Sequence, residues 1–223
     1  MSSIKLIILS MFMGLLLVAC AGPRYYVDPA WKGQPQPKTV KVIYTEPQIG
    51  NPDDLKDDLP EYEANFASGW FEPQLKTFLY ERANKSVDFS MNMVSADQIT
   101  TETVKLGKED FNAPSYASIE GDAEIYIVLS NVWVGRENEE YQTVQGNAAS
   151  EAMATPGSGM SLYKFFKCKA NYAFYEAKTK KILAYGTAEG KAQYQFAVDK
   201  GNWEFSLRDL AYHILIDTPV YHW

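Results

Sequence analysis

Two short stretches of the chain, residues 38–44 and 87–93, alternate between apolar and polar side chains. Their apolar positions are Val40, Val42 and Tyr44 in the first stretch and Val87, Phe89, Met91 and Met93 in the second. A period of two residues is typical of a β-strand that buries one face and exposes the other. The sequence therefore predicts two strands here, with these side chains pointing into the core.

Three longer stretches, residues 124–134, 163–175 and 182–196, predict the main part of a sheet. The first is apolar on both faces, which is typical of a central strand. The second alternates, and its apolar face holds Phe166, Cys168, Ala170, Tyr172 and Phe174. Lys178-Thr179-Lys180 then turns the chain back, so the second and third strands are expected to form a hairpin.

The third of these strands presents a row of small residues on one face, and this row predicts a closely packed neighbour. The row follows Ile182 and consists of Ala184, Gly186, Ala188, Gly190 and Ala192. Small side chains let a helix approach a sheet closely. The expected helix is residues 203–216, with Asn202 as its cap and an apolar face made of Trp203, Leu207, Leu210, Ala211, Ile214 and Leu215.

A second helix is predicted over residues 73–84, with Trp70 and Phe71 packed at its entry. Pro73 suits the first turn of a helix, and apolar residues follow it at helical spacing. Together these elements predict an α+β domain, with a single antiparallel or mixed sheet of about five strands and two main helices packed on one face.

Two regions do not follow a clear pattern. In residues 95–121, Thr100–Leu106 predicts at most a short strand, and Asn112-Ala113-Pro114 is expected to break the element that follows. Residues 137–160 begin with a charged run and continue with stretches of small residues, which predicts a mobile loop between paired strands. A functional loop stays open as the alternative for this segment.

The first 20 residues have the layout of a lipoprotein signal peptide. Lys5 supplies a positive start, and residues 6–18 form an apolar run that is too short to span a bilayer. Leu17-Val18-Ala19-Cys20 resembles the lipobox of bacterial lipoproteins. This resemblance implies removal of residues 1–19 and attachment of acyl chains such as palmitate to Cys20. An ordinary signal peptide that ends in cysteine, or a buried apolar helix, is the alternative.

Residues 20–37 are predicted to be the lipidated N-terminus and a proline-rich tether ahead of a single domain over residues 38–223. The prolines of the tether are Pro23, Pro29, Pro35 and Pro37. They disfavour regular structure, so the tether is expected to be extended and to hold the domain up to ~50 Å from the membrane. Tyr25, Tyr26 and Trp31 have two open placements: the domain surface, which we favour, or the lipid headgroups.

The charge and cysteine content narrow the class of function. The formal net charge is −7, which disfavours nucleic acid as a partner. The acidic stretch of residues 53–63 lacks the spacing of a calcium loop, so a solvated loop is predicted. Cys20 and Cys168 are the only cysteines, and with Cys20 acylated no disulfide is expected.

The sequence predicts no catalytic, cofactor-binding or metal-binding residues. His213 and His222 are the only histidines, and neither has a nucleophile and an acid that would complete a triad. Cys168 shares a strand face with Phe166 and Tyr172, so a buried and unreactive thiol is expected. No cysteine or histidine pair has the spacing of a metal site. A binding or structural protein is therefore predicted rather than an enzyme, and Cys20 is the single predicted site.

The order of the elements adds a resemblance to known families. The lipobox and tether, followed by strand, helix, strand, long hairpins and helix, are similar to the periplasmic lipoproteins related to the LpoB activators of penicillin-binding proteins, the CsgG curli lipoproteins and the N-terminal domain of TolB. The segments that carry this resemblance are residues 38–44, 75–82, 124–131, 172–186 and 203–216 with Pro219. It implies a non-enzymatic accessory or docking module for an envelope protein complex.

A second resemblance is to the auxiliary lipoproteins of lipid-trafficking ABC transporters. It rests on Arg24-Tyr25-Tyr26 shortly after Cys20 and on Trp70-Phe71-Glu72-Pro73 at the helix entry. It implies, as the alternative function, a transport-associated lipoprotein that binds an apolar ligand. The expected partners are the lipid bilayer, through acylated Cys20, and an envelope protein. Ala21 follows the cysteine, and by the sorting rule of enteric bacteria this implies the periplasmic side of the outer membrane, with the inner membrane as the alternative.

Overall fold

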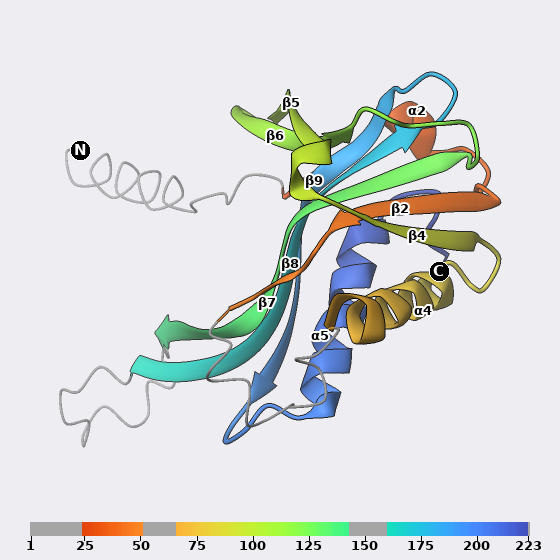
Figure 1. Cartoon of the computed structure of the whole chain (residues 1–223). Helices are drawn as coiled ribbons and strands as arrows, with labels where there is room; N and C mark the ends of the chain where they lie inside the picture. The colour runs from red at the N-terminus through yellow and green to blue at the C-terminus, as the bar shows by residue number, and fades with distance from the viewer. Residues whose placement is uncertain (1–23, 51–65, 143–159, 223) are drawn as a thin grey trace, which may run out of the picture.

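Seven strands form one curved, mixed sheet, and a two-stranded hairpin lies beside it (Figure 1). The computed structural model describes residues 24–50, 66–142 and 160–222. The strand order is β1-β9-β8-β7-β2-β4, with β3 paired to β7. The strands are β1 Tyr25–Val27, β2 Thr39–Thr45, β3 Gln48–Ile49, β4 Asp88–Val94, β7 Ile125–Gln142, β8 Met160–Glu176 and β9 Ile182–Tyr194, and the hairpin is β5 Ile99–Leu106 and β6 Glu109–Tyr116.

The predicted α+β class is confirmed, but the prediction of a single five-stranded sheet is wrong. β1 and β3 are three and two residues long, so they are too short to show an alternating pattern. The sheet is mixed because β2 is parallel to both β4 and β7, whereas β7, β8, β9 and β1 pair antiparallel.

Two helices, α4 (Glu72–Arg82) and α5 (Lys200–Leu215), cover one face of the sheet, as predicted. A π-helical turn, η2 (Phe66–Phe71), buries Trp70 and Phe71 where α4 begins. The Trp203 ring of α5 lies 5.1 Å from the Trp70 ring and 4.3 Å from the Phe166 ring of β8. Aromatic packing therefore joins both helices to the sheet in one core.

α5 begins earlier than predicted because Asp199 caps it. The Asp199 side chain accepts a hydrogen bond from the Asn202 N–H at 2.9 Å, and the Asn202 side chain accepts one from the Asp199 N–H at 3.0 Å. Asn202, the predicted cap, is thus the reciprocal member of a capping box. The predicted close approach to the row of small residues is confirmed at Gly190, where a Cβ atom would lie 1.9 Å from the Ser206 carbonyl oxygen.

The β5–β6 hairpin packs on the opposite face of the sheet, over Ile43, Val128 and Tyr175. The Tyr175 hydroxyl donates a hydrogen bond to the Pro114 carbonyl oxygen at 3.0 Å. The expected break at Asn112-Ala113-Pro114 is wrong, because Pro114 lies within β6. β6 pairs with β5 alone, and a strand with one neighbour tolerates proline.

The inward-facing side chains are mostly predicted correctly, with two exceptions. Met93 is 45% exposed, because β4 is the edge strand and its last residues are open to solvent. Ile182 packs in the core under the hairpin, whereas Ala184 packs in the core under the helices. The register between β8 and β9 shifts at Phe174 and Tyr175, and this irregularity breaks the simple alternation.

β7 and β8 continue as a pair past the other strands. Residues 139–142 and 160–163 pair with each other, with Gln142 opposite Met160, and project from the sheet (Figure 1). We call these residues the arm. The predicted loop over residues 137–160 is therefore wrong for residues 137–142 and 160, which are strand, and residues 143–159 lie outside the described ranges.

Residues 24–37 pack on the domain, which contradicts the prediction of an extended tether for this part. β1 pairs antiparallel with β9, and the short helix α2 (Pro29–Lys32) follows it. Trp31 is 4% exposed, so the domain surface, and not the lipid, holds this side chain. Pro29 sits in the first turn of α2, where its missing N–H costs nothing, so the prolines border short elements instead of preventing them.

Some predictions concern residues outside the described ranges, namely Cys20 with the signal of residues 1–19, and the acidic stretch of residues 53–63. Over the ranges that are described, none of the helices combines the length and the apolar character that a membrane crossing requires.

Candidate functional site: a pocket at one end of the sheet

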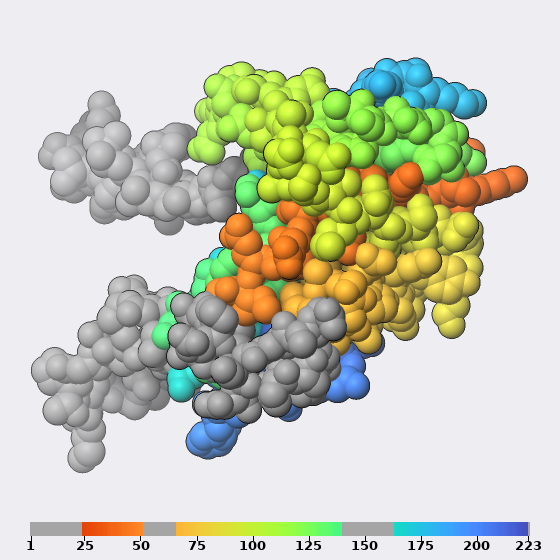
Figure 2. Space-filling view, in the orientation of Figure 1, coloured from red at the N-terminus to blue at the C-terminus, as the bar shows by residue number. Residues whose placement is uncertain are grey.

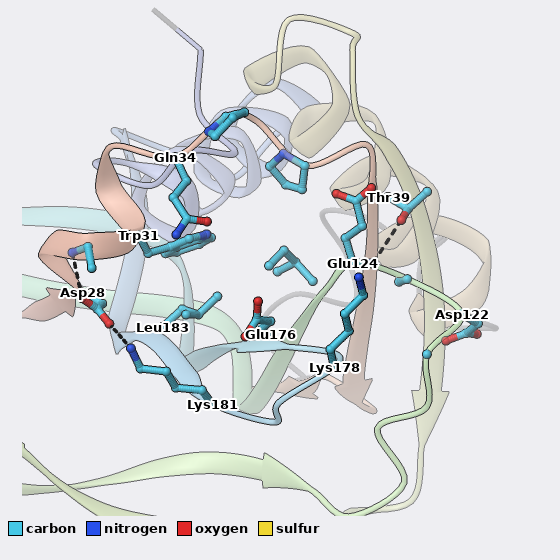
Figure 3. Close-up of a pocket in the computed structure, with 16 residues that line it drawn as sticks. Asp28, Trp31, Gln34, Thr39, Asp122, Glu124, Glu176, Lys178, Lys181 and Leu183 are labelled. Carbon is cyan, nitrogen blue, oxygen red and sulfur yellow. Dashed lines mark hydrogen bonds and ion pairs between the residues drawn. The ribbon is translucent and has the colours of Figure 1, made fainter.

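A cavity of about 450 Å³ opens at the end of the sheet where β2 and β7 begin and β8 turns into β9. We call this the pocket end. α2 and the chain that follows it form one wall, and the turns at residues 121–124 and 176–181 form the others (Figure 3). The lining includes the side chains of Asp28, Trp31, Asp122, Glu124, Ile125, Glu176, Lys178, Lys181 and Leu183.

The base of the pocket is apolar. Trp31, Ile125 and Leu183 line it, and each is buried. The Trp31 ring packs against Phe174 of β8, with 5.4 Å between the ring centroids. α2 holds Trp31 in this place, since the Asp28 side chain caps the helix by accepting a hydrogen bond from the Ala30 N–H at 2.8 Å.

Two of the carboxylates around the pocket have cationic partners. Asp28 pairs with Lys181 at 2.6 Å, which ties α2 to β9. Asp122 pairs with Lys41 at 2.5 Å and also accepts a hydrogen bond from the Tyr126 hydroxyl. Hydrogen bonds from Lys181 and from the Ala30 N–H lower the pKa of Asp28, and those from Lys41 and Tyr126 lower the pKa of Asp122. Both groups are therefore ionised at neutral pH, and their ion pairs connect the segments that form the pocket walls.

Glu124 and Glu176 differ from these two, because no lysine or arginine in the described ranges pairs with either. Glu124 accepts a hydrogen bond from the Lys38 N–H at 3.1 Å, and its own N–H donates to the Thr39 hydroxyl at 3.0 Å. Glu176 accepts one from the Thr179 hydroxyl at 2.5 Å. Figure 3 shows the Glu176 carboxylate pointing into the cavity, beside Leu183. The pocket thus presents two carboxylates that form no direct ion pair, next to the lysines Lys178 and Lys181, over an indole and two aliphatic side chains.

This arrangement suits a cation on an apolar stem. Arginine and lysine bury their methylene stems on apolar surfaces while the charged head stays hydrated or paired. An arginine or lysine stem could lie on the Trp31, Ile125 and Leu183 base while its head reaches Glu124 or Glu176.

The residues with candidate chemistry in the sequence lie elsewhere. Cys168 is fully buried, burial raises the pKa of its thiol to about 12, and its sulfur contacts the Ser206 hydroxyl at 3.2 Å. The prediction of a buried Cys168 is confirmed. His213 lies on α5, 3.6 Å from Asp209, and His222 follows the helix near the C-terminus. The structure does not bring these three residues together.

Sequence reasoning missed the pocket because its residues come from three separate turns. Asp28-Pro29 followed by Trp31 is a helix start with a large apolar residue, and this was the one local signal available. Glu124 directly precedes β7 and Glu176 is the last residue of β8, and neither stands out in the sequence. Only the pairing of β7 with β8, which sets Ile125 opposite Glu176, brings them to the same end.

A second polar cluster lies on the other half of the sheet, next to the arm. Its members are Glu137, Glu139, Lys167, Lys169, Glu189 and Lys191, on β7, β8 and β9. Lys167 lies 2.9 Å from Glu137 and 3.4 Å from Glu189, and it also pairs with Glu139. Burial alone would lower the pKa of Lys167, but the hydrogen bonds to Glu139 and Glu137 outweigh it and raise the pKa. The three cations and three anions balance one another.

The comparisons with known proteins give distant likenesses in fold. A neuraminyllactose-binding hemagglutinin homologue from Helicobacter pylori is 13% identical, with 82% of each chain covered and a TM-score of 0.34. The PelC dodecamer from Paraburkholderia phytofirmans is 11% identical, with 90% of this chain and 96% of that chain covered and a TM-score of 0.39. The hypothetical protein CT253 from Chlamydia trachomatis is 6% identical, with 79% and 88% covered and a TM-score of 0.32. No protein family and no curated protein matches the chain in sequence.

Proposed function

We propose that the protein is a membrane-anchored periplasmic lipoprotein that acts, without catalysis, as a docking module for an envelope protein. The observation that carries the docking role is the pocket end, where Glu124 and Glu176 stand without ionic partners over an apolar base. The partner is an envelope protein that presents an exposed arginine or lysine, and this side chain occupies the pocket.

Two contributions stabilise a basic side chain in the pocket. A basic side chain covers the Trp31, Ile125 and Leu183 base with its stem, which removes apolar surface from water. Its charged head then pairs with Glu124 or Glu176, and a partly exposed ion pair contributes about 0.2–1 kcal/mol. Neither contribution is large, so the pocket supplies one specific anchor within a wider contact and not the whole affinity.

A wholly apolar ligand fits the pocket less well. Its walls carry the charged side chains of Asp28, Glu124, Glu176, Lys178 and Lys181. An apolar molecule would strip water from these groups without replacing their hydrogen bonds, which costs free energy. The charged walls therefore favour docking of a basic residue over the alternative role as a carrier of an apolar ligand.

Binding of small probes to the purified protein tests the pocket. The cationic probe is N-acetylarginine amide, and its neutral control is N-acetylcitrulline amide, which has nearly the same shape. We expect the arginine probe to shift the NMR signal of the Trp31 indole N–H, identified with a Trp31→Phe variant, and the citrulline probe to leave it unchanged. Equal shifts from both probes would contradict the proposed role of the carboxylates.

Matched variants sharpen this test. Glu124→Gln and Glu176→Gln should each weaken binding of the arginine probe about two- to fivefold, the equivalent of one surface ion pair. Glu204→Gln on α5, away from the pocket, is the control and should leave the affinity unchanged. In cells, a photocrosslinker at Lys178 should capture one envelope protein, and the Glu124→Gln/Glu176→Gln double variant should lose that product.

The membrane anchor needs a separate measurement. The motivation for it is Cys20 after Leu17-Val18-Ala19. Mass spectrometry of the N-terminal peptide should show an acylated Cys20 as the first residue, and fractionation should place the protein in the outer membrane. An unmodified Cys20 or a retained signal peptide would remove the anchor from the proposal.

A further inference from the structure

The strand β1 shows from which direction the chain enters the domain. β1 runs antiparallel to β9, with Tyr25 opposite Gly186 and Val27 opposite Ala184. The chain therefore passes along β9 toward the pocket end as it goes from Arg24 to Asp28. The start of β1 thus points back toward the opposite side of the sheet, where β9 ends at Tyr194 and the arm projects. We call this the arm end of the sheet.

The covalent chain between the expected lipid site and β1 is short. Cys20 and Arg24 are separated by four peptide units, which span at most ~14 Å. From Thr187, the position next to Arg24 along β9, the strand runs seven residues further to Tyr194, which is ~23 Å. A lipid on Cys20 therefore cannot be held beyond the arm end. An orientation with the arm end toward the bilayer brings this end to the level of the acyl chains, because the short link cannot lift the domain away from the lipid.

Of the large apolar side chains in the described ranges, the two most exposed lie at the arm end. Phe196, just after β9, is 92% exposed, and Phe205, in the second turn of α5, is 58% exposed. The connection between β9 and α5 projects at the lower edge of the molecule (Figure 2). Aromatic side chains without a protein neighbour are typical of surfaces that meet a partner or a membrane interface.

The charges near the arm end do not oppose contact with a bilayer. The cluster of Glu137, Glu139, Lys167, Lys169, Glu189 and Lys191 is neutral in total and internally paired. By contrast, the two carboxylates without ionic partners lie at the pocket end. Anionic headgroups would therefore meet no excess negative charge from these six residues at the arm end.

We propose that the arm end of the sheet rests on the lipid bilayer, with Phe196 and Phe205 at the headgroup level, so that the pocket faces away from the membrane. This inference rests on the proposed lipid attachment at Cys20. It adds an orientation: the site for the partner protein is presented at the far side of the domain, about the length of β9 away from the lipid.

The test uses the full-length lipidated protein in vesicles of phosphatidylethanolamine and phosphatidylglycerol. An environment-sensitive NBD fluorophore is attached through Ala197→Cys, next to Phe196, or through Lys178→Cys at the pocket rim. The buried thiol of Cys168 does not compete for the label, and acylation occupies Cys20. We expect a blue shift and about twofold quenching by doxyl-labelled lipids at position 197, and neither effect at position 178.

Two further variants separate the orientation from the anchor. Phe196→Ser with Phe205→Ser should reduce the quenching at position 197 while the protein still floats with the vesicles, because the acyl chains remain.

Failure to float, with an unmodified Cys20, would overturn both the anchor and the orientation. Normal flotation with an unquenched label at position 197, or with quenching at position 178, would overturn the orientation alone. A blue shift without vesicles that grows with protein concentration would assign the two phenylalanines to self-association and also overturn the inference.

Discussion

At the pocket end β2, β4 and β7 begin and a short turn joins β8 to β9, whereas at the arm end β7 and β8 run on as a pair after their neighbours have stopped. β2 and β4 have seven residues each, but β7 and β8 have 18 and 17. The pocket end is held by single ion pairs and helix caps, such as Asp28 with Lys181. The arm end is held by a network of six charged residues that spans three strands. The same sheet thus supports an open cavity at one end and a long ordered projection at the other.

The largest expected effect comes from removing α5, which packs on the arm half of the sheet. Truncation after Gly201 deletes the apolar side that fills the space over Gly190, so we expect cooperative thermal unfolding to be lost. Leu210→Ala removes one apolar side chain of α5 instead of the whole helix and should lower the free energy of unfolding by about 2–5 kcal/mol. Circular dichroism melts measure both changes. An unaltered melting temperature after truncation would show that α5 does not complete the core.

At the pocket end, the corresponding change is Trp31→Ala. Trp31 is buried against Phe174, so its removal should cost about 3–5 kcal/mol in the free energy of unfolding. Gln34→Ala, on the exposed rim of the same segment, is the control and should stay within about 0.5 kcal/mol of the wild type. Chemical denaturation provides the measurement. A small loss for Trp31→Ala would mean that residues 24–37 are only loosely attached.

A smaller effect is expected from Lys167→Met in the charged cluster. Lys167 is 5% exposed but its partners reach solvent, so we expect a loss of about 1–2 kcal/mol at neutral pH, below that of a fully buried pair. Lys181→Met at the pocket end breaks an exposed pair with Asp28 and should cost less still. A larger loss for Lys181→Met than for Lys167→Met would reverse the comparison of the two ends.

The pH dependence of stability sharpens this prediction. Burial raises the pKa of Glu137, but hydrogen bonds from Lys169 and Lys167 outweigh it and hold the pKa below the ordinary value of 4.5. The contribution of Glu137 is therefore present above pH 4.5 and is lost as the pH falls below it. Lys167→Met should lose less stability than the wild type over that acidic range, as measured by denaturation at a series of pH values.

The smallest expected effect is at Cys168. The thiol is fully buried, and burial raises its pKa to about 12, so almost no thiolate forms at neutral pH. A thiol reagent should therefore leave Cys168 unmodified in the native protein and modify it after addition of denaturant. Rapid labelling under native conditions would indicate that α5 separates from β8 in solution.

Sequence patterns predicted the long elements and missed the short ones for a physical reason. β2, β4, β8 and α5 each bury one face along several periods, so alternation or helical spacing identifies them. β1, β3 and α2 have two to four residues and exist because β9, β7 and the pocket end provide partners for them. The charged run at residues 137–140 was predicted as part of a loop, because a single sequence does not show that Glu137 pairs with Lys167 and Lys169 of β8.

The pocket was beyond sequence reasoning for a related reason. Glu124 and Glu176 are 52 residues apart in the chain, and their shared position depends on the register that places Ile125 opposite Glu176. A single sequence gives the alternation of a strand but not its pairing partner. Which residues meet at the pocket rim depends on the order of the strands in the sheet. The sequence did not predict this order, because some strands pair in parallel and others antiparallel.

The attachment of residues 24–37 has a mechanical consequence. Tyr25 donates a hydrogen bond to Asp217 at 2.9 Å, and Lys32 pairs with the same carboxylate at 3.2 Å, so the start of the folded chain is fastened near its end. The hydrogen bonds between β1 and β9 lie across the strand direction, so a pull along β1 toward the arm end loads them together and not one after another. If the anchor is a lipid on Cys20, tension between the membrane and a bound partner runs through this short strand and the sheet, and the domain transmits force without first unwinding its own N-terminus.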